Sequence, residues 1–415
     1  MKHENTLMEV ICRQKREQEE KVPFYVFDTD HLCEHIKNIK NRLSGQITLC
    51  YAIKANPFLV KPMDEQMEKY EVCSPGELDI CIRAGIDMKK VVFSGVNKQP
   101  QDVAKAIDAG VGVVTLESLR HFEMVRDYVQ QKQICVNVLP RLSNGAQFGM
   151  DASEVESLIA QREKYPQLNF IGVQYFTGTQ KKLKKTLEEL DFITNYVKKL
   201  EETYAFDAQI IEYGPGLKVP YFQGEDFDVP YDELEEVVRF VKEQGGKYQY
   251  VFELGRYIAA GCGYYAASVV DKKQTEGKWF ALLDGGMNHV NYYGQTMAMR
   301  IPRLTHYQKE EECFYNASDY HAKCSEDEAL AGKSEAFCLC GSLCTFADVL
   351  MRKIFLKNLQ LDDVLVFHNI GAYSITEGIY LFLSRSMPEV YFYNEKGGLQ
   401  LVREKFETSS INGCC

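Results

Sequence analysis

The sequence predicts a (β/α)8 (TIM) barrel followed by a C-terminal antiparallel β domain. Eight strand-like runs alternate with helical patterns before residue 257, which is the order that a closed barrel requires. After residue 257 the strand-like runs follow one another through turns, which is typical of an antiparallel sheet. The G-x-G-x-x-G signature of an open doubly wound sheet is absent after the first strand, and we therefore favour the barrel.

A charged helical segment over 1–22 and a short strand over 23–28 come first in the chain. Asp30 can cap a helix whose apolar positions step by four, three and four residues: Leu32, Ile36, Ile39 and Leu43. Barrel strands are expected at 48–55, 70–74, 91–95, 112–117, 134–140, 169–177, 208–214 and 249–255. Helices are expected at 58–69, 76–84, 101–109, 118–131, 151–163, 181–204 and 231–244, and later strands at 264–270, 279–283, 336–339, 364–368, 390–393 and 399–402.

These elements divide the chain into domains. We expect a lead-in over 1–29 whose strand joins the β domain, the barrel over 30–257, and the β domain over 258–407. Residues 305–335 are polar, acidic and rich in Ala and Ser, which predicts a mobile insertion. The tail over 408–415 is expected to be disordered.

Charge and composition exclude several classes of function. The net charge of -11 argues against nucleic acid and against an anionic membrane surface as partners. No apolar run approaches the roughly 18 residues of a membrane span, and Met1 to Lys21 lacks a signal-peptide core, so we expect a cytoplasmic protein. Many of the 14 cysteines lie in apolar strands and would be small hydrophobic residues in a reducing compartment. Cys338, Cys340 and Cys344 lack the paired C-x-x-C spacing of a zinc site, and no metal is expected.

The first barrel strand carries the most informative residue, Lys54. The run Leu49 to Ala55 is apolar except for this lysine, and Asn56-Pro57 ends it. Lysine is rarely buried without a partner, so a lysine at the end of a buried strand suggests an amine whose pKa desolvation lowers for Schiff-base chemistry. The alternative is a lysine that extends into solvent, which is the commoner case for a single lysine.

Other strand ends can supply a phosphate site and an acid. Active sites of barrel enzymes lie at the carboxyl ends of the strands. The sixth strand runs into Thr177-Gly178-Thr179, the seventh ends in Gly214-Pro215-Gly216, and the eighth ends in Glu253-Leu254-Gly255-Arg256. Glycine loops with an arginine can hold a phosphate, and a carboxylate beside a pyridine nitrogen keeps it protonated. Amine, phosphate site and acid together are what pyridoxal phosphate requires, although each piece alone is weak.

Here the sequence resembles a known family. Tyr51-Ala52-Ile53-Lys54-Ala55-Asn56 is similar to the cofactor-lysine motif of the alanine-racemase-like (fold type III) pyridoxal phosphate decarboxylases, which include diaminopimelate and ornithine decarboxylases. Later blocks match in the same order, and the resemblance covers residues 23–405: Cys73 to Leu78, Glu253 to Tyr257, Gly341 to Cys344 and Gly371 to Tyr373.

The resemblance implies a role for each matching residue. Lys54 would be the Schiff-base lysine, Glu253 the partner of the pyridine nitrogen, and Phe176 the ring that stacks on the cofactor. The phosphate would be held by Thr179, Gly214, Gly216, Gly255, Arg256 and Tyr373. These enzymes resemble one another in being head-to-tail homodimers with shared active sites, so Cys344, with Asp348 nearby, would reach the site of the other subunit. Cys344 would protonate the carbanion left by decarboxylation, and Arg300 is weakly similar to a substrate-carboxylate arginine.

Three departures from the family pattern bear on the substrate. Phe176 stands where the family has histidine, Pro215 replaces the middle glycine of a triple glycine, and Thr345 replaces an acidic residue. Because that acid helps to recognise the distal amine of a diamino acid, its loss puts lysine, ornithine and diaminopimelate in doubt as substrates. The motifs look most like a biosynthetic subgroup similar to the butirosin-pathway enzyme that decarboxylates a glutamyl group on a carrier protein.

A lysine cluster is compatible with a carrier protein as partner. Positive charge at a helix N-terminus opposes the helix dipole, so local stability does not explain a cluster there. An acidic carrier or a phosphopantetheine arm would explain it. The cluster follows the sixth strand and comprises Lys181, Lys182, Lys184 and Lys185.

The sequence therefore predicts a pyridoxal phosphate-dependent decarboxylase of an L-amino-acid-type substrate that is acylated, otherwise modified or carrier-linked. Three alternatives remain open. They are a diaminopimelate, ornithine or lysine decarboxylase of primary metabolism, an amino-acid racemase on the same barrel, and a homologue that has lost catalysis and serves as a regulatory partner.

Overall fold

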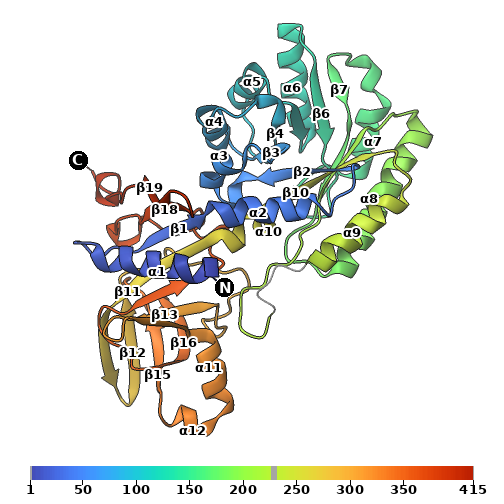
Figure 1. Ribbon diagram of the computed structural model, residues 1–415. Coiled ribbons are helices and arrows are strands. Elements are labelled where there is room, and N and C mark those ends of the chain that lie inside the picture. The colour runs from blue at the N-terminus through green and yellow to red at the C-terminus, as the bar shows by residue number, and fades with distance from the viewer. Residues whose placement is uncertain (1, 226–230, 415) are drawn as a thin grey trace. The chain divides into compact units, whose positions relative to one another are not determined.

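The computed structural model describes residues 2–225 and 231–414, which fall into two units (Figure 1). The barrel unit comprises Cys33–Val219 and Pro230–Ile258. The β unit comprises Met1–Leu32, Pro220–Val229 and Ala259–Cys415. The β unit thus takes segments from both ends of the chain, because an early strand, β1 (Phe24–Asp28), pairs with strands near the C-terminus.

A parallel sheet forms the centre of the barrel unit. Among the described residues its strand order is β7-β6-β5-β4-β3-β2-β10-β9-β8. The bounds are β2 Ile47–Ala52, β3 Lys69–Val72, β4 Val91–Phe93, β5 Val113–Leu116, β6 Val136–Pro140, β7 Leu168–Phe170, β8 Gly172–Phe176, β9 Ile210–Gly214 and β10 Gln249–Leu254.

The sheet closes on itself between β6 and β8. Only Ile171 separates β7, which pairs with β6, from β8, which pairs with β9. At the end of β6 a parallel bridge joins Arg141 to Gln174 of β8, and the Leu142 amide donates to the Gln174 carbonyl at 2.9 Å. Since β7 and β8 together make the sixth strand, the predicted (β/α)8 barrel is confirmed.

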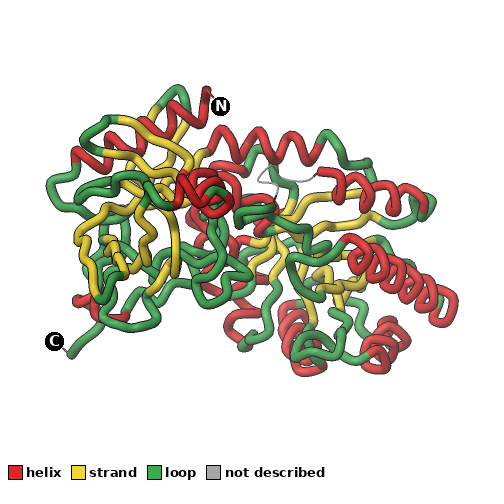
Figure 2. Tube along the Cα trace, turned by 90° about the horizontal axis from the view of Figure 1, so that it is seen from below, coloured by secondary structure: helices red, strands yellow, loops and turns green. Residues whose placement is uncertain are grey.

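Helices surround these strands, as Figure 2 shows with strands in yellow and helices in red. Their burial follows the apolar spacing of the sequence, as in α9, where Leu234, Val237, Val238 and Val241 face the barrel core. The α-helices of this part are α2 Thr29–Lys40, α3 Val60–Met63, α4 Pro75–Ala84, α5 Pro100–Asp108, α6 Leu119–Lys132, α7 Ala152–Ala160, α8 Leu183–Tyr204, α9 Tyr231–Glu243 and α10 Arg256–Ala259. Single-turn 3-10 helices are η1 Ile53–Ala55, η2 Pro57–Leu59, η3 Met88–Lys90, η4 Arg162–Lys164 and η5 Ala260–Cys262.

The helix predicted over 58–69 is much shorter than expected. The structure has only η2 and the four-residue α3 there. Pro57 and Pro62 lack the backbone N–H groups that a continuous helix would use. Leu59, Val60 and Met63 are nevertheless fully or almost fully buried, so the short turn is enough to cover this side of the barrel.

The β unit contains a mixed sheet that is largely antiparallel. Its main strand order is β14-β13-β17-β11-β1-β18-β19, and β12, β15 and β16 extend from β11. The bounds are α1 Lys2–Glu17, β11 Gly263–Thr275, β12 Lys278–Leu283, β13 Leu304–Gln308, β14 Cys313–Asn316, α11 Ala317–Glu326, α12 Glu328–Ala331, β15 Glu335–Cys340, β16 Val349–Leu356, β17 Val364–Phe367, η6 Phe382–Ser384, β18 Glu389–Asn394, β19 Gly398–Arg403 and η7 Thr408–Ser410. Helix α1 packs Leu7, Met8 and Ile11 against the apolar side chains of β1 and β11.

Residues 305–335, expected to form a mobile insertion, contain regular structure instead. Strand β13 pairs with both β14 and β17, and α11 follows. The polar sequence of β13 hid this strand because its buried polar side chains have partners: His306 Nε2 lies 2.8 Å from Asp363 Oδ2, and Thr305 Oγ1 lies 2.8 Å from His368 Nε2. Burying polar groups is tolerated when they are hydrogen-bonded in this way.

The tail was expected to be disordered, and the structure gives part of it a defined place. Thr408 is fully buried, and the Asn412 side-chain amide donates to the Leu381 carbonyl at 2.7 Å. Cys415 lies outside the described residues. Over the described ranges, no helix combines the length and the apolar character needed to cross a membrane.

Candidate active site

Lys54 lies at the carboxyl end of β2, within the short turn η1. Its neighbours Ile53 and Ala55 are fully buried, while its own side chain is 37% exposed at the mouth of the barrel. The Lys54 Nζ donates to Glu71 Oε2 at 2.8 Å and to Cys73 Sγ at 3.5 Å, and both partners come from the end of β3. The predicted amine therefore sits at the end of a buried strand with an ionic partner.

The Lys54 ammonium controls the ionisation of Glu71. Burial would raise the pKa of the Glu71 carboxyl, but the charge and hydrogen bond of Lys54 outweigh it and hold that pKa below its usual value. Glu71 is therefore an ionised carboxylate at neutral pH, positioned to hold or receive a proton of the Lys54 amine.

Glu253 lies inside the barrel near the end of β10 and is 7% exposed. The Gln174 side-chain amide donates to Glu253 Oε1, and also to Glu212 Oε1 of β9 at 2.9 Å. Burial raises the pKa of Glu253, and the negative charge of Glu71 raises it further. Burial and the charge of Glu253 also raise the pKa of Glu212, so these two carboxyls share one proton-binding region.

Phe176 ends β8 and lies over the same barrel mouth as Lys54. The Lys54 Nζ is 5.9 Å from the centroid of the Phe176 ring. Gly214 makes this position of the ring possible, because a Cβ atom at residue 214 would lie 2.1 Å from Phe176 Cδ2. The observed position of the Phe176 ring on β8 therefore requires a glycine at residue 214 on the neighbouring strand β9.

The loops after β8 and β9 lie against each other. Gly216 has φ +60°, and a Cβ there would lie 2.5 Å from the Gly178 carbonyl oxygen and 3.2 Å from Thr179 Cα. Gly178 has φ +135° with open space beside its Cα. Both positions favour glycine, and the result is a half-buried backbone turn beside the loop that carries Thr179.

Gly255 and Arg256 complete the strand-end set. A Cβ at Gly255 would lie 3.0 Å from the Ala55 Cβ and 3.3 Å from the Ala52 carbonyl oxygen, so β10 and the Lys54 turn approach closely here. Arg256, at the start of α10, is 7% exposed. This set of groups fits pyridoxal phosphate. The amine suits its aldehyde, the buried carboxyl and the aromatic ring suit its pyridine ring, and the glycine turns with the arginine suit its phosphate.

Two charged residues of the barrel mouth escaped the sequence analysis. Arg141, just after β6, donates from Nη1 to Glu117 Oε1 at 2.6 Å, and the Gly149 amide donates to Glu117 Oε2 at 3.0 Å. The Arg141 guanidinium lies 5.9 Å from the Phe176 ring centroid. Both residues lie at or just after the ends of predicted strands, and this position was the one signal that could have identified them. Their pairing could not be predicted, because they are 24 residues apart in the sequence.

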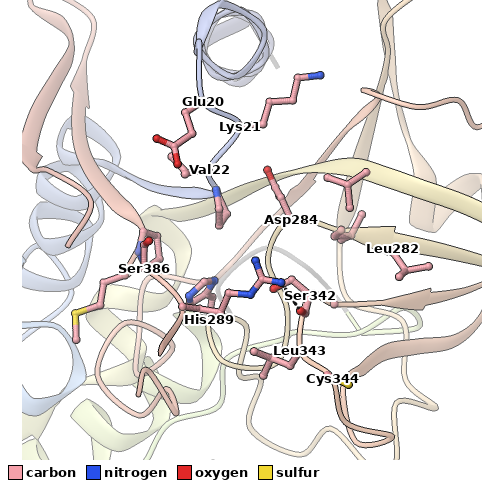
Figure 3. A pocket seen from close by; sticks show the side chains of 17 residues that line it. Glu20, Lys21, Val22, Leu282, Asp284, His289, Ser342, Leu343, Cys344 and Ser386 are labelled. Atoms are coloured by element: carbon pink, nitrogen blue, oxygen red, sulfur yellow. Dashed lines mark hydrogen bonds between the residues drawn. The ribbon is translucent and has the colours of Figure 1, made fainter. Parts of the chain in front are cut away.

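Cys344 and Asp348 belong to the β unit and lie in the loop between β15 and β16. Cys344 is exposed and lines a cavity of about 610 Å³ that Lys21, Asp284 and His289 also line (Figure 3). Asp348 is 3% exposed, and its carboxylate accepts the Met287 amide at 2.8 Å and the Leu343 amide at 2.7 Å. Asp348 was predicted as a substrate residue beside Cys344, and in this unit its oxygens hold the loop that carries Cys344.

Arg300 and Tyr373 are the other predicted residues in the β unit. The Arg300 Nη2 donates to Glu225 Oε1 at 2.5 Å, and its guanidinium stacks on the Phe222 ring with 3.9 Å between Cζ and the centroid. Tyr373 has φ +68°, an uncommon backbone conformation for an aromatic residue, and its carbonyl accepts the Glu377 amide at 2.8 Å. Such strain often marks a functional segment.

The structure removes one lysine, Lys181, from the predicted docking cluster of four. The Lys181 side chain is 8% exposed, and its Nζ donates to Glu189 Oε2 at 2.6 Å and to the Gly214 carbonyl at 2.9 Å. Including Lys181 in a docking surface was therefore wrong, because a buried carboxylate holds it inside. Lys184 and Lys185 are exposed and lie near Glu188 and Glu189, which offset their charge.

Comparison with known proteins agrees with this architecture. The sequence pattern of the family described as "Pyridoxal-dependent decarboxylase, pyridoxal binding domain" matches residues 29–260. The chain is 25% identical over 413 residues to L-glutamyl-[BtrI acyl-carrier protein] decarboxylase of Niallia circulans, covering 94% of this chain and 92% of that protein. It is also 25% identical over 418 residues to 2-[(L-alanin-3-ylcarbamoyl)methyl]-2-hydroxybutanedioate decarboxylase of Staphylococcus aureus, covering 94% and 98%.

A solved structure shares the whole fold. The crystal structure of diaminopimelate decarboxylase from Helicobacter pylori complexed with L-lysine superposes with a TM-score of 0.81. The match covers 96% of this chain and 98% of that chain at 20% identity. At this identity the likeness supports the fold alone.

Proposed function

Since the chain belongs to the pyridoxal-dependent decarboxylases, we propose that it removes the α-carboxylate of an L-amino-acid-type substrate whose distal part is acylated, otherwise modified or carrier-linked. The observation that carries this proposal is the meeting of Lys54, Glu253 and Phe176 at one end of the barrel. Pyridoxal phosphate, when bound, supplies an aldehyde carbon for an amine and a pyridine ring that accepts electrons.

In this proposal Lys54 binds the cofactor covalently, and Glu71 positions its amine. Glu71 is ionised and 2.8 Å from the Lys54 Nζ, so it would orient this amine and hold a proton close to that nitrogen. Glu253 would pair with the pyridine nitrogen and favour its protonated form, and the hydrogen bond from Gln174 fixes the position of the Glu253 carboxyl. Phe176 would pack on the cofactor ring, and the residues that would hold the phosphate are Thr179, Gly214, Gly216, Gly255, Arg256 and Tyr373.

We also propose that the enzyme is a homodimer in which Cys344 serves the barrel of the partner subunit. Asp348 fixes the loop that presents this exposed thiol. The dimer predicts complementation: mixing inactive Lys54→Ala with Cys344→Ala should restore activity to about a quarter of wild type, because one of the two sites in a mixed dimer has both residues. Each variant refolded alone is the control, and absence of restored activity in mixed dimers verified by mass would contradict shared sites.

The substrate proposal rests on Thr345 and on the two relatives at 25% identity, whose names describe a carrier-linked glutamyl group and a bulky amide of a hydroxy acid. A site that recognises a distal ammonium needs an anionic partner, and Thr345 has no charge. Arg300, exposed and stacked on Phe222, is proposed to bind a carboxylate of the distal group in place of Glu225. A diamino-acid substrate is the second candidate, because diaminopimelate decarboxylases are also among the proteins of similar sequence.

The experiment that tests this function measures CO2 release from a panel of substrates. We expect kcat/KM for carrier-linked or acylated amino acids to exceed that for free lysine, ornithine and diaminopimelate by about a hundredfold or more. Arg300→Met should reduce the turnover of substrates whose distal group bears a carboxylate and leave the turnover of other substrates unchanged. Efficient turnover of free diaminopimelate would return the enzyme to primary metabolism, and loss of optical activity without CO2 would indicate a racemase.

A further inference from the structure

Two cysteines lie side by side on strand β15. The Cys338 and Cys340 sulfur atoms are 3.8 Å apart. Side chains two residues apart on a strand share a face, and Phe337 and Leu339 point to the opposite face, where both are fully buried. The two thiols are therefore partly exposed, on the outer face of the sheet and close enough to react with one another.

The surroundings make one of the two thiols acidic. The hydrogen bond from Cys340, together with the positive charges of Arg352 and Lys278, lowers the pKa of Cys338 to about 7. The same hydrogen bond raises the pKa of Cys340, which keeps its proton. Burial instead raises the pKa of Cys12 and Cys81 to about 12. This pair therefore combines a nucleophilic thiolate with an adjacent protonated thiol.

The backbone is irregular at this pair. The ladder between β15 and β16 shifts register between Phe337 and Leu339 and again between Leu339 and Cys340. Two residues of strand span about 6.6 Å between Cα atoms, which is near the upper limit of about 6.8 Å for a disulfide. Because register shifts interrupt the ladder hydrogen bonds, the strand can bend here by the small amount that a bridge requires.

We propose that Cys338 and Cys340 form a reversible oxidation site whose oxidant is a low-molecular-weight disulfide of the glutathione type. The Cys338 thiolate attacks one sulfur of the small disulfide, breaks its S–S bond and releases one thiolate. Cys340 then loses its proton to solvent and attacks Cys338 Sγ, which releases the second small thiol. Two protein thiols are oxidised by two electrons, and one small disulfide is reduced to two thiols. The strained product is easily reduced again.

Closing this bridge would act on the segment that carries Cys344. Residue 341 follows Cys340 directly, and its amide donates to the Asp348 carbonyl at 3.1 Å. A Cβ at Gly341 would lie 2.4 Å from both Asp348 carboxylate oxygens, so the turn packs closely against this side chain. We therefore expect a bend at Cys340 to displace the loop as well. We expect oxidation of the pair to lower the rate of decarboxylation, and this expectation rests on the proposed function. The thiol chemistry itself does not depend on that function.

Peptide mapping of the full-length protein treated with glutathione disulfide tests the site without any substrate. We expect an intramolecular link between Cys338 and Cys340, a mass loss of two hydrogen atoms, and full reversal by dithiothreitol. In Cys340→Ser a stable glutathione adduct should accumulate on Cys338, since no thiol resolves it. The control, Cys313→Ser, removes an exposed cysteine of the same unit and should behave as wild type. Cys338 should react at least about tenfold faster than Cys313.

Two results would overturn the proposal. The first concerns the wild-type protein. If glutathione is found on Cys344 or Cys313 while Cys338 and Cys340 can still be alkylated, the pair is not the reactive site. In Cys340→Ser, equal labelling of all exposed cysteines would show that Cys338 has no special reactivity. Because the wild-type map needs no substitution and no turnover, it remains decisive if a variant fails to fold or if the decarboxylase proposal is wrong.

Discussion

Lys54→Ala is expected to lose covalently bound pyridoxal phosphate and to reduce decarboxylation at least about a thousandfold, the order seen when a covalent nucleophile is removed. The fold should persist, because the Lys54 side chain is partly exposed. Its loss leaves Glu71 buried without its cation, and we therefore expect some loss of thermal stability as well. Cofactor absorbance in the visible range and CO2 release measure the two effects.

The control for this variant is Lys61→Ala, which removes an exposed lysine of the same barrel and should change neither property. Lys98 is a more demanding comparison. It is 2% exposed, burial lowers its pKa to about 8, and its Nζ donates to the Gly95 carbonyl at 2.6 Å. If Lys54→Ala kept its absorbance and Lys98→Ala lost it, the assigned lysine would be wrong.

Glu253→Gln is expected to retain the bound cofactor and to lower kcat by about a hundredfold, as when one fixed electrostatic partner is removed from an active site. The amide has nearly the same shape, and Gln174 can still hydrogen-bond to its oxygen. It carries no charge, however, and cannot keep a pyridine nitrogen protonated. The measurements are kcat for CO2 release and the amount of bound cofactor.

The matched control for that variant is Glu212→Gln, which changes the neighbouring carboxyl on the same Gln174 amide. Because burial and the charge of Glu253 already raise the pKa of Glu212 well above its usual value, its amide should have a smaller effect on kcat. Equal loss in both variants would indicate that the pair acts as one structural unit and that Glu253 has no separate role toward the ring.

The sequence was informative where local order in the chain determines structure. The strand that ends at Lys54 and the helix of Leu234, Val237, Val238 and Val241 both follow from apolar spacing. Glu253 was found because it lies near the end of a strand, where barrel enzymes carry their chemistry.

Side-chain contacts between residues that are far apart in the chain could not be predicted from the sequence. Nothing in the local pattern shows that Gln174 bridges Glu212 and Glu253, or that Arg141 pairs with Glu117. Strand β16 was missed because Arg352 and Lys353 are both exposed at a register shift, which breaks the alternation of a strand. Lys181 was taken for a surface residue because its buried partner Glu189 is eight positions away along α8.

The central claim, that Lys54 is the amine that binds the cofactor, can be measured on the unmodified protein. The full chain is incubated with pyridoxal phosphate, reduced with borohydride, digested and mapped by mass spectrometry. We expect one reduced cofactor adduct, on the peptide that contains Lys54. An adduct on Lys98 or on any other lysine, or no adduct at saturating cofactor, would contradict it.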